Sequence, residues 1–358
     1  MNISSILVII QRSNGDVLLS TTLIDQLQKQ LKPHAIDLLV NDDTLAIAKT
    51  LPYIRQIHTF SYQQKQTSRW SQEKSIIKKI YKKYDLSINL TASDRSVLYA
   101  LLASKQAISA IEKNKGKSWW KRLLLKHHYQ FDSKKHILLN NLEPLSCLDL
   151  SPYNKQIAPR INEDSVNSIS NRLKKLNISK FIIFHPSAQY NYKIYSETLR
   201  NELLRLLNKL DVAIIVTGSN NKIDTLIKNN LPILNNIVNW IGQTSIEEYI
   251  ALSEISQGYI GMDTLNMHIA ASQNKRIFAI FGPTILAMWS PWSNQVQTAA
   301  TIDMPVQTYG NITIFQANMA CVACGKAGCD NKHGKSECLY KIKPRVVFEE
   351  VEKWYKSL

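Results

Sequence analysis

The sequence contains no apolar run that approaches the roughly eighteen residues of a membrane span. Its first residues also lack the basic flank and the cleavage site of a secretory signal peptide, so we expect residues 6–10 to form a first strand. We find no internal repeat and no low-complexity segment. These absences favour a globular cytoplasmic protein, and 358 residues are enough for two domains with cores of their own.

Familiar nucleotide-binding and nucleic-acid-binding signatures are also missing. No glycine loop has the spacing of a P-loop or of the dinucleotide motif G-x-G-x-x-G. This argues against an ATPase and against an NAD-dependent enzyme. No recognition-helix or RNA-binding signature is present either.

Acidic residues are outnumbered. The chain has 44 Lys and Arg but 28 Asp and Glu, a formal net charge of +16, which suits nucleic acid, an anionic membrane or a phosphorylated substrate. Residues 113–136 carry eight Lys or Arg and one acid, together with Trp119, Trp120 and three leucines. This pattern predicts either a helix at a membrane interface or a solvated basic helix whose tryptophans reach the core.

Strand-like and helix-like segments alternate along the chain and predict an α/β fold with parallel sheets covered on both faces. In the first half, we expect strands at 6–10, 36–40, 55–60 and 85–90, and helices at 17–31, 44–50, 73–84 and 96–103. A polar stretch with Pro152 and Pro159 then marks the domain junction. In the second half, we expect strands at 180–185, 212–217, 257–260 and 276–281, and helices at 164–176, 196–210, 221–229, 245–253 and 264–272. Two such halves imply a cleft, with ligands beyond the carboxyl ends of the strands.

The stretch Gly261 to Ala271 joins a buried strand to an apolar helix. A helix that begins near Asp263 and Thr264 presents backbone N–H groups and the positive end of its dipole, which favour a phosphate. The plainer interpretation is that Asp263 or Thr264 is only the N-cap.

Three other polar loops follow expected strands. Residues 13–16 end in Asp16, which is either an N-cap or a general base that faces the cleft. Residues 185–193 end in Lys193, either a surface lysine or a positive charge for a diphosphate leaving group. Thr217 and Gly218 open a loop that suits the backbone cradle of a nucleotide.

Four of the five cysteines lie within eighteen residues of one another: Cys321, Cys324, Cys329 and Cys338. In a cytoplasmic chain such a cluster favours a metal over disulfides, and four thiolates suit a structural zinc. The spacing is neither that of a zinc ribbon nor that of a zinc knuckle. The alternative is a set of reduced thiols that pack a small loop.

Taken in order, these loops resemble glycosyltransferase family 9, the ADP-heptose:lipopolysaccharide heptosyltransferases. The family motifs S-x-G-D, H-P-G-A-S…K, V-x-T-G, L-x-G-x-T-S, G-x-D-[ST]-G-x-x-H-L-A-A and F-G-P-T…W are similar to residues 13–16, 185–193, 216–218, 241–245, 261–271 and 281–289. The likeness covers nearly the whole chain in the right order.

The resemblance implies the glycosyltransferase-B fold, in which two Rossmann-like domains face each other across a cleft. We expect an acceptor-binding domain at 1–155 and a nucleotide-sugar-binding domain at 156–358. The latter includes the Cys-rich segment 321–338 and a C-terminal helix able to pack back on the first domain.

The same resemblance implies inverting transfer of a heptose from ADP-heptose to the inner core of lipopolysaccharide or lipooligosaccharide, with no cofactor needed for catalysis. The acceptor would be a phosphorylated Kdo–lipid A or core glycolipid. The enzyme would then attach peripherally to the anionic inner face of the inner membrane, and nucleic acid would not be a partner.

Residue roles follow from the same likeness. Asp16 would deprotonate the acceptor hydroxyl. The donor-binding residues would be Ser187, Lys193, Thr217, Gly218, Asp263, Thr264 and His268, and the acceptor-binding residues would be Arg12, Ser13, Asn14 and Gly15. Two positions depart from the family pattern. Leu265 and Ser187 stand where glycine is usual, and at Leu265 a side chain hinders close approach of the backbone to the donor.

Other functions stay open. The chain could be a glycosyltransferase that uses another nucleotide-sugar, or a nucleotide-sugar epimerase on a similar two-domain fold. A basic nucleic-acid-binding protein with a zinc site would explain the charge and the cysteines, but it leaves the strand-end loops without a role.

Overall fold

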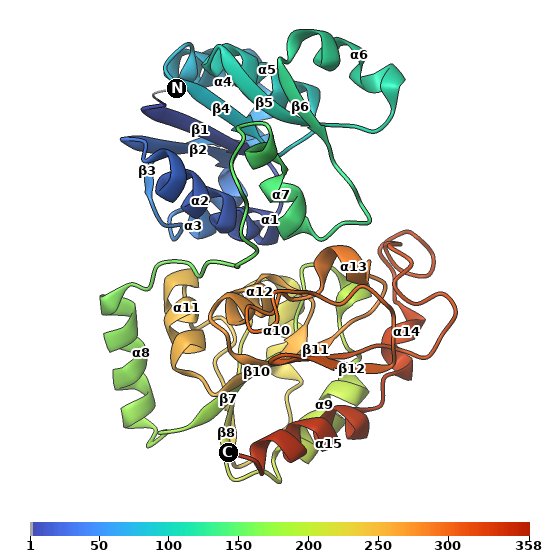
Figure 1. The fold of residues 1–358 in the computed structure, drawn as a ribbon. Helices are drawn as coiled ribbons and strands as arrows, with labels where there is room; N and C mark the ends of the chain where they lie inside the picture. The colour runs from blue at the N-terminus through green and yellow to red at the C-terminus, as the bar shows by residue number, and fades with distance from the viewer. Residues whose placement is uncertain (1–2) are drawn as a thin grey trace. The chain divides into compact units, whose positions relative to one another are not determined.

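The computed structural model describes residues 3–358; Met1 and Asn2 lie outside the described part. The chain divides into two compact units, one that ends at Arg160 and one that spans Ile161–Leu358. Each unit is built on a largely parallel β-sheet with helices on both faces (Figure 1). The predicted α/β fold class is therefore confirmed.

Six parallel strands form the sheet of the first unit, in the order β3-β2-β1-β4-β5-β6. They are β1 (Ser5–Ile10), β2 (Ala35–Asn41), β3 (Ile54–Phe60), β4 (Leu86–Asn89), β5 (Gln106–Ile111) and β6 (His127–Gln130). The side chains of residues 6–10 in β1 are buried, as expected for a central strand covered on both faces. Strand order reverses between β1 and β4, and such a switch point is where open α/β sheets place their ligands.

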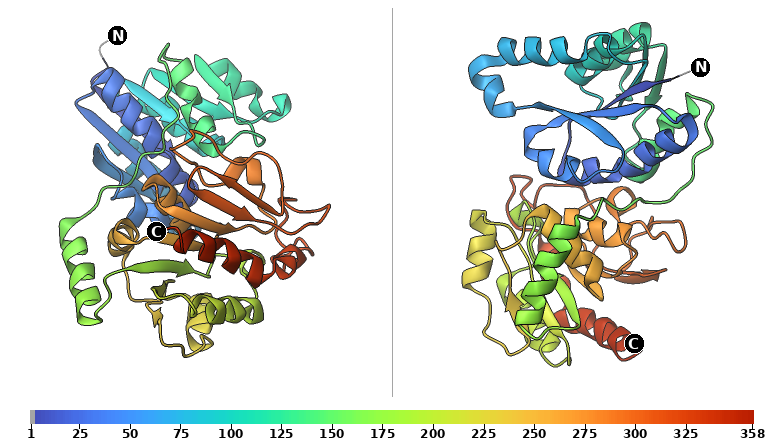
Figure 2. Two further views of the ribbon diagram at one scale, coloured as in Figure 1. Left: turned by 60° about the horizontal axis from the view of Figure 1, so that its bottom comes forward. Right: turned by 90° about the vertical axis from the view of Figure 1, so that its left-hand side faces the viewer.

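Two helical layers cover this sheet. One face carries α4 (Tyr62–Ile80), α5 (Asp94–Ala103) and α6 (Lys115–Leu124) (Figure 1). The opposite face carries α1 (Asn14–Leu19), α2 (Thr21–Leu31), η1 (Asp42–Thr44), α3 (Leu45–Ala48) and α7 (Ile137–Ser146). In the first layer, α4 bends at Ser68, where the backbone leaves helical geometry (φ −145°, ψ 46°; Figure 2).

The single helix expected at 17–31 is two helices. The Ser20 hydroxyl donates to the Val17 carbonyl at 2.7 Å, and the Thr21 hydroxyl lies 2.7 Å from the Leu18 carbonyl and 2.8 Å from the Ile157 carbonyl. Such side-chain bonds to the backbone compete with the helical ladder and divide α1 from α2.

The polar stretch near the predicted junction lies along α2. The Thr22 hydroxyl donates to the Lys155 carbonyl, and the Gln26 amide bonds the backbone of Tyr153 in both directions, at 2.8 and 3.0 Å. This stretch therefore packs as part of the first unit.

Seven strands form the sheet of the second unit, in the order β12-β13-β11-β10-β7-β8-β9. They are β7 (Phe181–His185), β8 (Ala213–Val216), β9 (Ile237–Asn239), β10 (Gly258–Met262), β11 (Arg276–Ile280), β12 (Val306–Tyr309) and β13 (Ile312–Phe315). The helices are α8 (Glu163–Lys175), η2 (Asn191–Lys193), α9 (Glu197–Leu207), α10 (Lys222–Asn229), α11 (Ile246–Ile255), α12 (Leu265–Ser272), α13 (Leu286–Trp289), α14 (Glu337–Lys341) and α15 (Pro344–Tyr355). Only the edge pair β12–β13 is antiparallel among the described strands.

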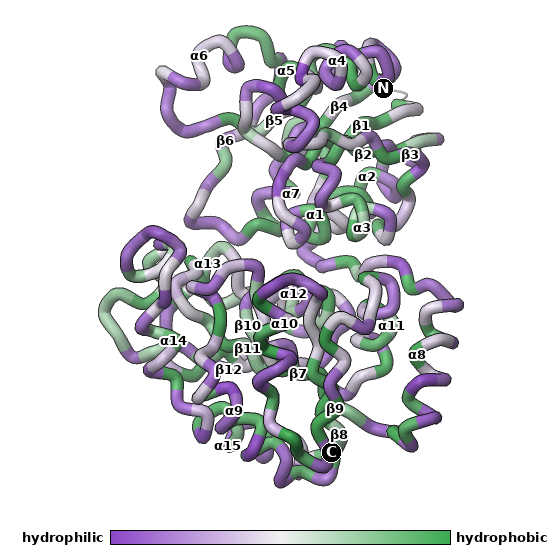
Figure 3. The backbone as a smooth tube through the Cα atoms, turned by 180° about the vertical axis from the view of Figure 1, so that it is seen from behind, coloured by the Kyte–Doolittle hydropathy of each residue, from purple (hydrophilic) through white to green (hydrophobic). Residues whose placement is uncertain are grey.

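The C-terminal helix α15 packs on α9 within the second unit. Val347 and Val351 are fully buried there, and the Trp354 ring lies 5.5 Å from that of Phe278. Its apolar face completes the core of the second unit, and the expectation that this helix also packs back on the first unit stays a prediction. Figure 3 shows that hydrophobic residues predominate in the strands. In α8, hydrophilic and hydrophobic residues alternate along the helix. Within residues 3–358, no helix is long and apolar enough to cross a bilayer.

Candidate functional site

In the first unit, the candidate base lies just beyond the carboxyl end of β1. Ser13 is the N-cap of α1, and Asp16 is the third helical residue, so the two form a capping box. The Ser13 hydroxyl donates to Asp16 Oδ2 at 2.6 Å, while Arg12 Nε lies 2.9 Å from Asp16 Oδ1. The structure thus brings Arg12, Ser13 and Asp16 together, with Asn14 and Gly15 as the first two residues of α1.

Asp16 is not the N-cap that the plainer interpretation made it, because Ser13 takes that place. Its side chain is 5% exposed, and both carboxylate oxygens are oriented by neighbours. A carboxylate fixed in this way at a strand end can accept a proton from a hydroxyl that reaches it.

In the second unit, Lys193, Asp263 and His268 share one site. Lys193 ends η2 after β7, Asp263 follows β10, and Lys193 Nζ lies 2.8 Å from Asp263 Oδ2. Burial opposes the charged form of Lys193, but the adjacent Asp263 carboxylate raises the pKa of Lys193, so its amine is protonated at neutral pH. The site therefore offers a cation beside a helix N-terminus, as a diphosphate requires.

His268, on α12, is a neutral member of this site. Its burial lowers its pKa to about 4, while the charges of Asp263 and Lys193 act in opposite directions. At neutral pH its imidazole therefore carries one ring proton and can donate one hydrogen bond while accepting another.

Thr264 is the N-cap of α12, with extended backbone (φ −146°, ψ 174°). Among the described residues it forms no side-chain capping bond; its hydroxyl lies 3.4 Å from the Tyr259 hydroxyl. Leu265, where the family usually has glycine, is the first residue of the helix. The strand-to-helix junction predicted for residues 261–271 is confirmed.

Ser187 and Thr217 belong to a buried polar cluster that contacts α12 through His185 and Asn266, 3.3 Å apart. The Ser187 hydroxyl donates to the Asp224 carboxylate, and the Thr217 hydroxyl lies 3.0 Å from His185 Nδ1. Burial lowers the pKa of His185 to about 4, against the attraction of Asp224. Because Ser187 is 3% and Thr217 1% exposed, both side chains are buried and stabilise the loops that follow β7 and β8.

Asp224 is the residue that sequence reasoning missed. Its carboxylate accepts hydrogen bonds from Ser187, from the Ser219 hydroxyl at 2.7 Å and from the Ser219 backbone N–H. A Cβ on Gly218 would lie 3.2 Å from Asp224 Cγ, so glycine allows this close packing. The one available signal was the spacing Asn221-x-x-Asp224, because Asn221 caps α10 and bonds the Asp224 backbone.

We expect Asp224→Ala to destabilise the second unit. It would leave four donors without their acceptor, of which only the Ser187 hydroxyl is buried, because Ser219 and Asn221 are exposed. One unsatisfied buried donor costs about 1–3 kcal/mol, so the expected loss is about 1–3 kcal/mol. Guanidinium denaturation of the full chain measures it, with the exposed Asp211→Ala as matched control. Equal stability of the two variants would contradict the role of Asp224.

The two buried histidines also predict a pH dependence of folding. Their lowered pKa values mean that the unfolded chain, with histidine pKa near 6.5, binds more protons than the folded chain. Their contribution to stability is full above about pH 6.5 and is lost as the pH falls toward 4. We expect a slope approaching about 1.4 kcal/mol per pH unit for each histidine, measured by denaturation between about pH 5 and 6.5. His268→Gln should lower the slope of stability against pH by the contribution of one histidine. An unchanged slope in that variant would contradict the lowered pKa of His268.

The Cys-rich segment 321–338 packs beside the Lys193 loop. The His333 ring lies 5.6 Å from that of Tyr190 and 5.7 Å from that of Tyr192. The backbone N–H of Gly325 donates to the Pro283 carbonyl at 2.7 Å. The segment therefore contacts two loops that follow the strands β7 and β11.

The thiols of this segment do not fit a metal as they lie. Cys321, Cys324 and Cys329 are exposed, while burial raises the pKa of the Cys338 thiol to about 11. Cys329 Sγ accepts a hydrogen bond from the Glu337 backbone N–H at 3.3 Å. Across the described residues 3–358, no group of three or more His, Cys, Asp or Glu side chains is arranged to hold a metal ion.

Comparison with known proteins gives one consistent result. The model of glycosyltransferase family 9 (heptosyltransferase) matches residues 74–311. Lipopolysaccharide heptosyltransferase 3 of Escherichia coli is 24% identical over 295 residues, which cover 80% of this chain and 85% of that protein. The structure of E. coli ADP-heptose lps heptosyltransferase II superimposes with a TM-score of 0.73 at 18% identity and covers 99% of each chain. E. coli heptosyltransferase WaaC with ADP gives a TM-score of 0.71 at 14% identity, covering 98% of this chain and 99% of that one.

Proposed function

The chain belongs to glycosyltransferase family 9, the heptosyltransferases, and from this premise we propose that it transfers a heptose from ADP-heptose to the inner core of lipopolysaccharide or lipooligosaccharide. The observation that carries the proposal is the ion pair of Lys193 with Asp263 at the N-terminus of α12, beside neutral His268. The ADP in the WaaC structure and the names of the relatives support the choice of donor and acceptor.

Lys193 and the N-terminus of α12 would bind the diphosphate of the donor. A positive charge and helix N–H groups stabilise the negative charge that develops as the sugar–phosphate bond breaks. Because Asp263 already orients Lys193, little rearrangement is needed when the donor binds. His268 would hydrogen-bond the donor as a neutral imidazole.

Asp16 would accept the proton of the acceptor hydroxyl. The hydroxyl oxygen forms the new bond to the anomeric carbon, the bond from that carbon to the diphosphate breaks, and the electron pair leaves with ADP. A single displacement inverts the configuration of the anomeric carbon. The reaction so written needs no metal, and the acceptor would contact Arg12, Ser13, Asn14 and Gly15.

The discriminating experiment combines purified protein, ADP-heptose and a truncated lipopolysaccharide acceptor, and follows ADP release together with the mass of the acceptor. We expect ADP release only with acceptor, matched by addition of one heptose. Release without acceptor would indicate a hydrolase, and interconversion of the free nucleotide-sugar an epimerase. If the protein transferred sugar from another nucleotide-sugar but not from ADP-heptose, the choice of donor would be wrong.

Two parts of the proposal stand apart from the chemistry. A glycolipid acceptor places the protein at the cytoplasmic face of the inner membrane as a peripheral enzyme. The structural zinc at Cys321, Cys324, Cys329 and Cys338 remains a hypothesis of its own, which would require the thiols to converge. Elemental analysis tests it, and a folded preparation free of zinc would contradict it.

A further inference from the structure

The helix α6 departs in part from the pattern of an ordinary surface helix, although Trp120 packs on the core and Lys115 and Lys117 are exposed in the usual way. It buries Lys121 completely and exposes three large apolar side chains: Trp119 at 65%, Leu123 at 75% and Leu124 at 57%. A helix that borders only water normally turns its apolar side chains inward and its lysines outward. The pattern in α6 therefore indicates that its outer side meets something other than water.

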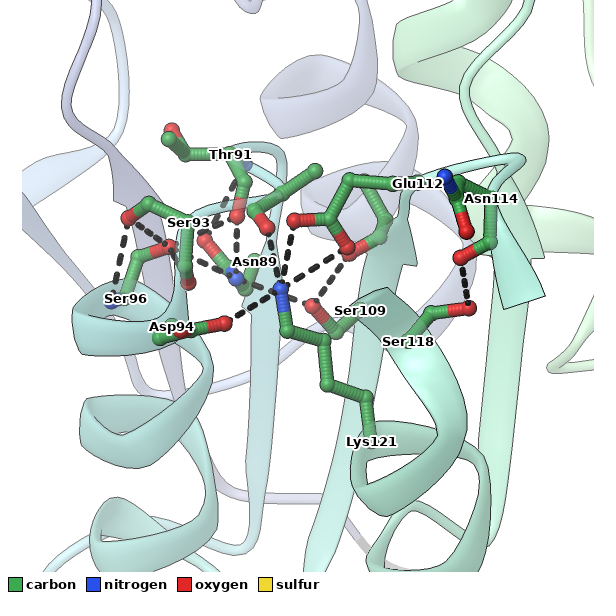
Figure 4. Close-up of polar contacts among 12 residues, drawn as sticks. Asn89, Thr91, Ser93, Asp94, Ser96, Ser109, Glu112, Asn114, Ser118 and Lys121 are labelled. Carbon is green, nitrogen blue, oxygen red and sulfur yellow. Dashed lines mark hydrogen bonds and ion pairs between the residues drawn. The ribbon is translucent and has the colours of Figure 1, made fainter. Parts of the chain in front are cut away.

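Figure 4 shows the polar contacts that hold the Lys121 side chain in place. Lys121 Nζ lies 2.8 Å from Asp94 Oδ1 at the start of α5, 2.7 Å from Glu112 Oε1 after β5, and 2.7 Å from the Ala92 carbonyl. The lysine is fully buried, while the side chains of Asp94 and Glu112 are 70% and 33% exposed. A buried charge needs such partners, so these contacts anchor α6 at the carboxyl ends of β4 and β5. The contacts of Lys121 with Asp94, Glu112 and the Ala92 carbonyl thus fix α6 in the orientation that exposes Leu123 and Leu124.

The neighbouring helices of the same layer also expose apolar side chains. Trp70 on α4 is 73% exposed, and Leu98 on α5 is 47% exposed. Helices α4, α5 and α6 lie on one face of the six-stranded sheet (Figures 1 and 2). Five of their exposed hydrophobic residues define what we call the α4–α6 face: Trp70, Leu98, Trp119, Leu123 and Leu124.

The chain segment that contains these three helices also carries most of the positive charge of the protein. Residues 62–126 contain fifteen Lys or Arg and four Asp or Glu, a net charge of +11 out of +16 for the whole chain. All four acids are engaged inside the unit. Glu73 accepts from the Tyr99 hydroxyl, Asp85 accepts from the backbone of Ser4 and Ser5, and Asp94 and Glu112 pair with Lys121.

We propose that the α4–α6 face docks on an anionic lipid bilayer. Tryptophan and leucine side chains enter the boundary between headgroups and acyl chains, while the flanking lysines and arginines bind anionic headgroups. Lysine stems can extend from the helices to the headgroups while their apolar parts stay in contact with lipid. The proposed glycolipid acceptor is the reason for choosing a membrane as the source of the anionic headgroups.

A nucleic acid is the other anionic macromolecule that this charge could bind. Phosphate contacts need the lysines and arginines but give no role to exposed Leu123 and Leu124. The two partners therefore differ in their dependence on the apolar residues, which makes them separable by experiment.

The test is co-sedimentation of the full chain with phosphatidylethanolamine–phosphatidylglycerol vesicles, compared with phosphatidylcholine vesicles. We expect binding to the anionic vesicles and a loss of about tenfold or more in the triple variant Trp119→Ser, Leu123→Ser, Leu124→Ser. The matched control Leu226→Ser, Ile233→Ser removes apolar residues of the second unit that are 64% and 102% exposed, and should bind as wild type does. Circular dichroism checks that each variant is folded.

Three results would overturn the proposal: no binding of the wild-type protein to anionic vesicles, equal binding by the triple variant, or binding to duplex DNA that exceeds vesicle binding and survives in the triple variant. Vesicle binding requires no donor and no turnover, so its outcome is independent of whether heptose transfer is observed. If transfer occurs, the triple variant should keep its activity on a delipidated, soluble acceptor and lose activity on an acceptor embedded in vesicles.

Discussion

Asp16→Asn is expected to lower kcat by about 10²–10⁴-fold while leaving the dissociation constant of the donor nearly unchanged. Asparagine keeps the size of the side chain and can still accept from the Ser13 hydroxyl, but it cannot take up the proton of the acceptor hydroxyl. Steady-state kinetics with ADP-heptose and acceptor give kcat, and calorimetry with ADP gives donor-site binding.

Asp25→Asn is the matched control for this prediction. Asp25 is also a buried carboxylate of the first unit, 2% exposed, and it pairs with Lys29 at 2.8 Å and with the Tyr153 hydroxyl. If loss of a buried carboxylate acted only through folding, both variants would lose activity in proportion to their loss of stability. A wild-type kcat in Asp16→Asn would remove Asp16 as the base.

Lys193→Ala is expected to weaken donor binding by about ten- to a hundredfold, since a hydrogen bond to a charged group contributes about 1.5–3 kcal/mol. The variant also leaves the Asp263 carboxylate, which is 7% exposed, without its cation, and this negative charge would repel the diphosphate. Both the KM for ADP-heptose and the dissociation constant of ADP should therefore increase.

Lys275→Ala provides the comparison for Lys193→Ala. Lys275 is a lysine of the same unit that bonds the Glu254 carbonyl near the amino end of β11. It should leave the KM for the donor unchanged. An equal effect of both substitutions, or no effect of Lys193→Ala, would contradict a diphosphate site at Lys193.

The sequence was sufficient to predict features that depend on local periodicity. Buried strands such as β1 and β7 appear as short apolar runs, and the loop from Gly261 to the helix at 264–272 contains its own strand-to-helix signal. The order of the loops along the chain then indicated the family. Lys193 and Asp263 are seventy residues apart, and the structure shows them in contact.

Features that depend on tertiary contacts were missed. From sequence alone, a lysine between Trp120 and Arg122 is expected to be solvated; its burial depends on contacts with Asp94, Glu112 and the Ala92 carbonyl, which only the structure shows. We expected Trp119 and Trp120 to be either both at a membrane interface or both in the core. Instead, Trp120 packs on the core while Trp119 is exposed, because consecutive residues lie on different sides of a helix. The β12–β13 hairpin was also missed, although Gly310 and Asn311 mark its turn.

The most direct measurement of the central claim is an NMR determination of the anomeric configuration of the product formed from ADP-heptose and a truncated lipopolysaccharide acceptor. The account predicts one new glycosidic bond whose configuration is opposite to that of the donor, with one ADP released for each bond formed. Retained configuration, or ADP release without a new glycosidic bond, would contradict the single displacement assigned to Asp16 and Lys193.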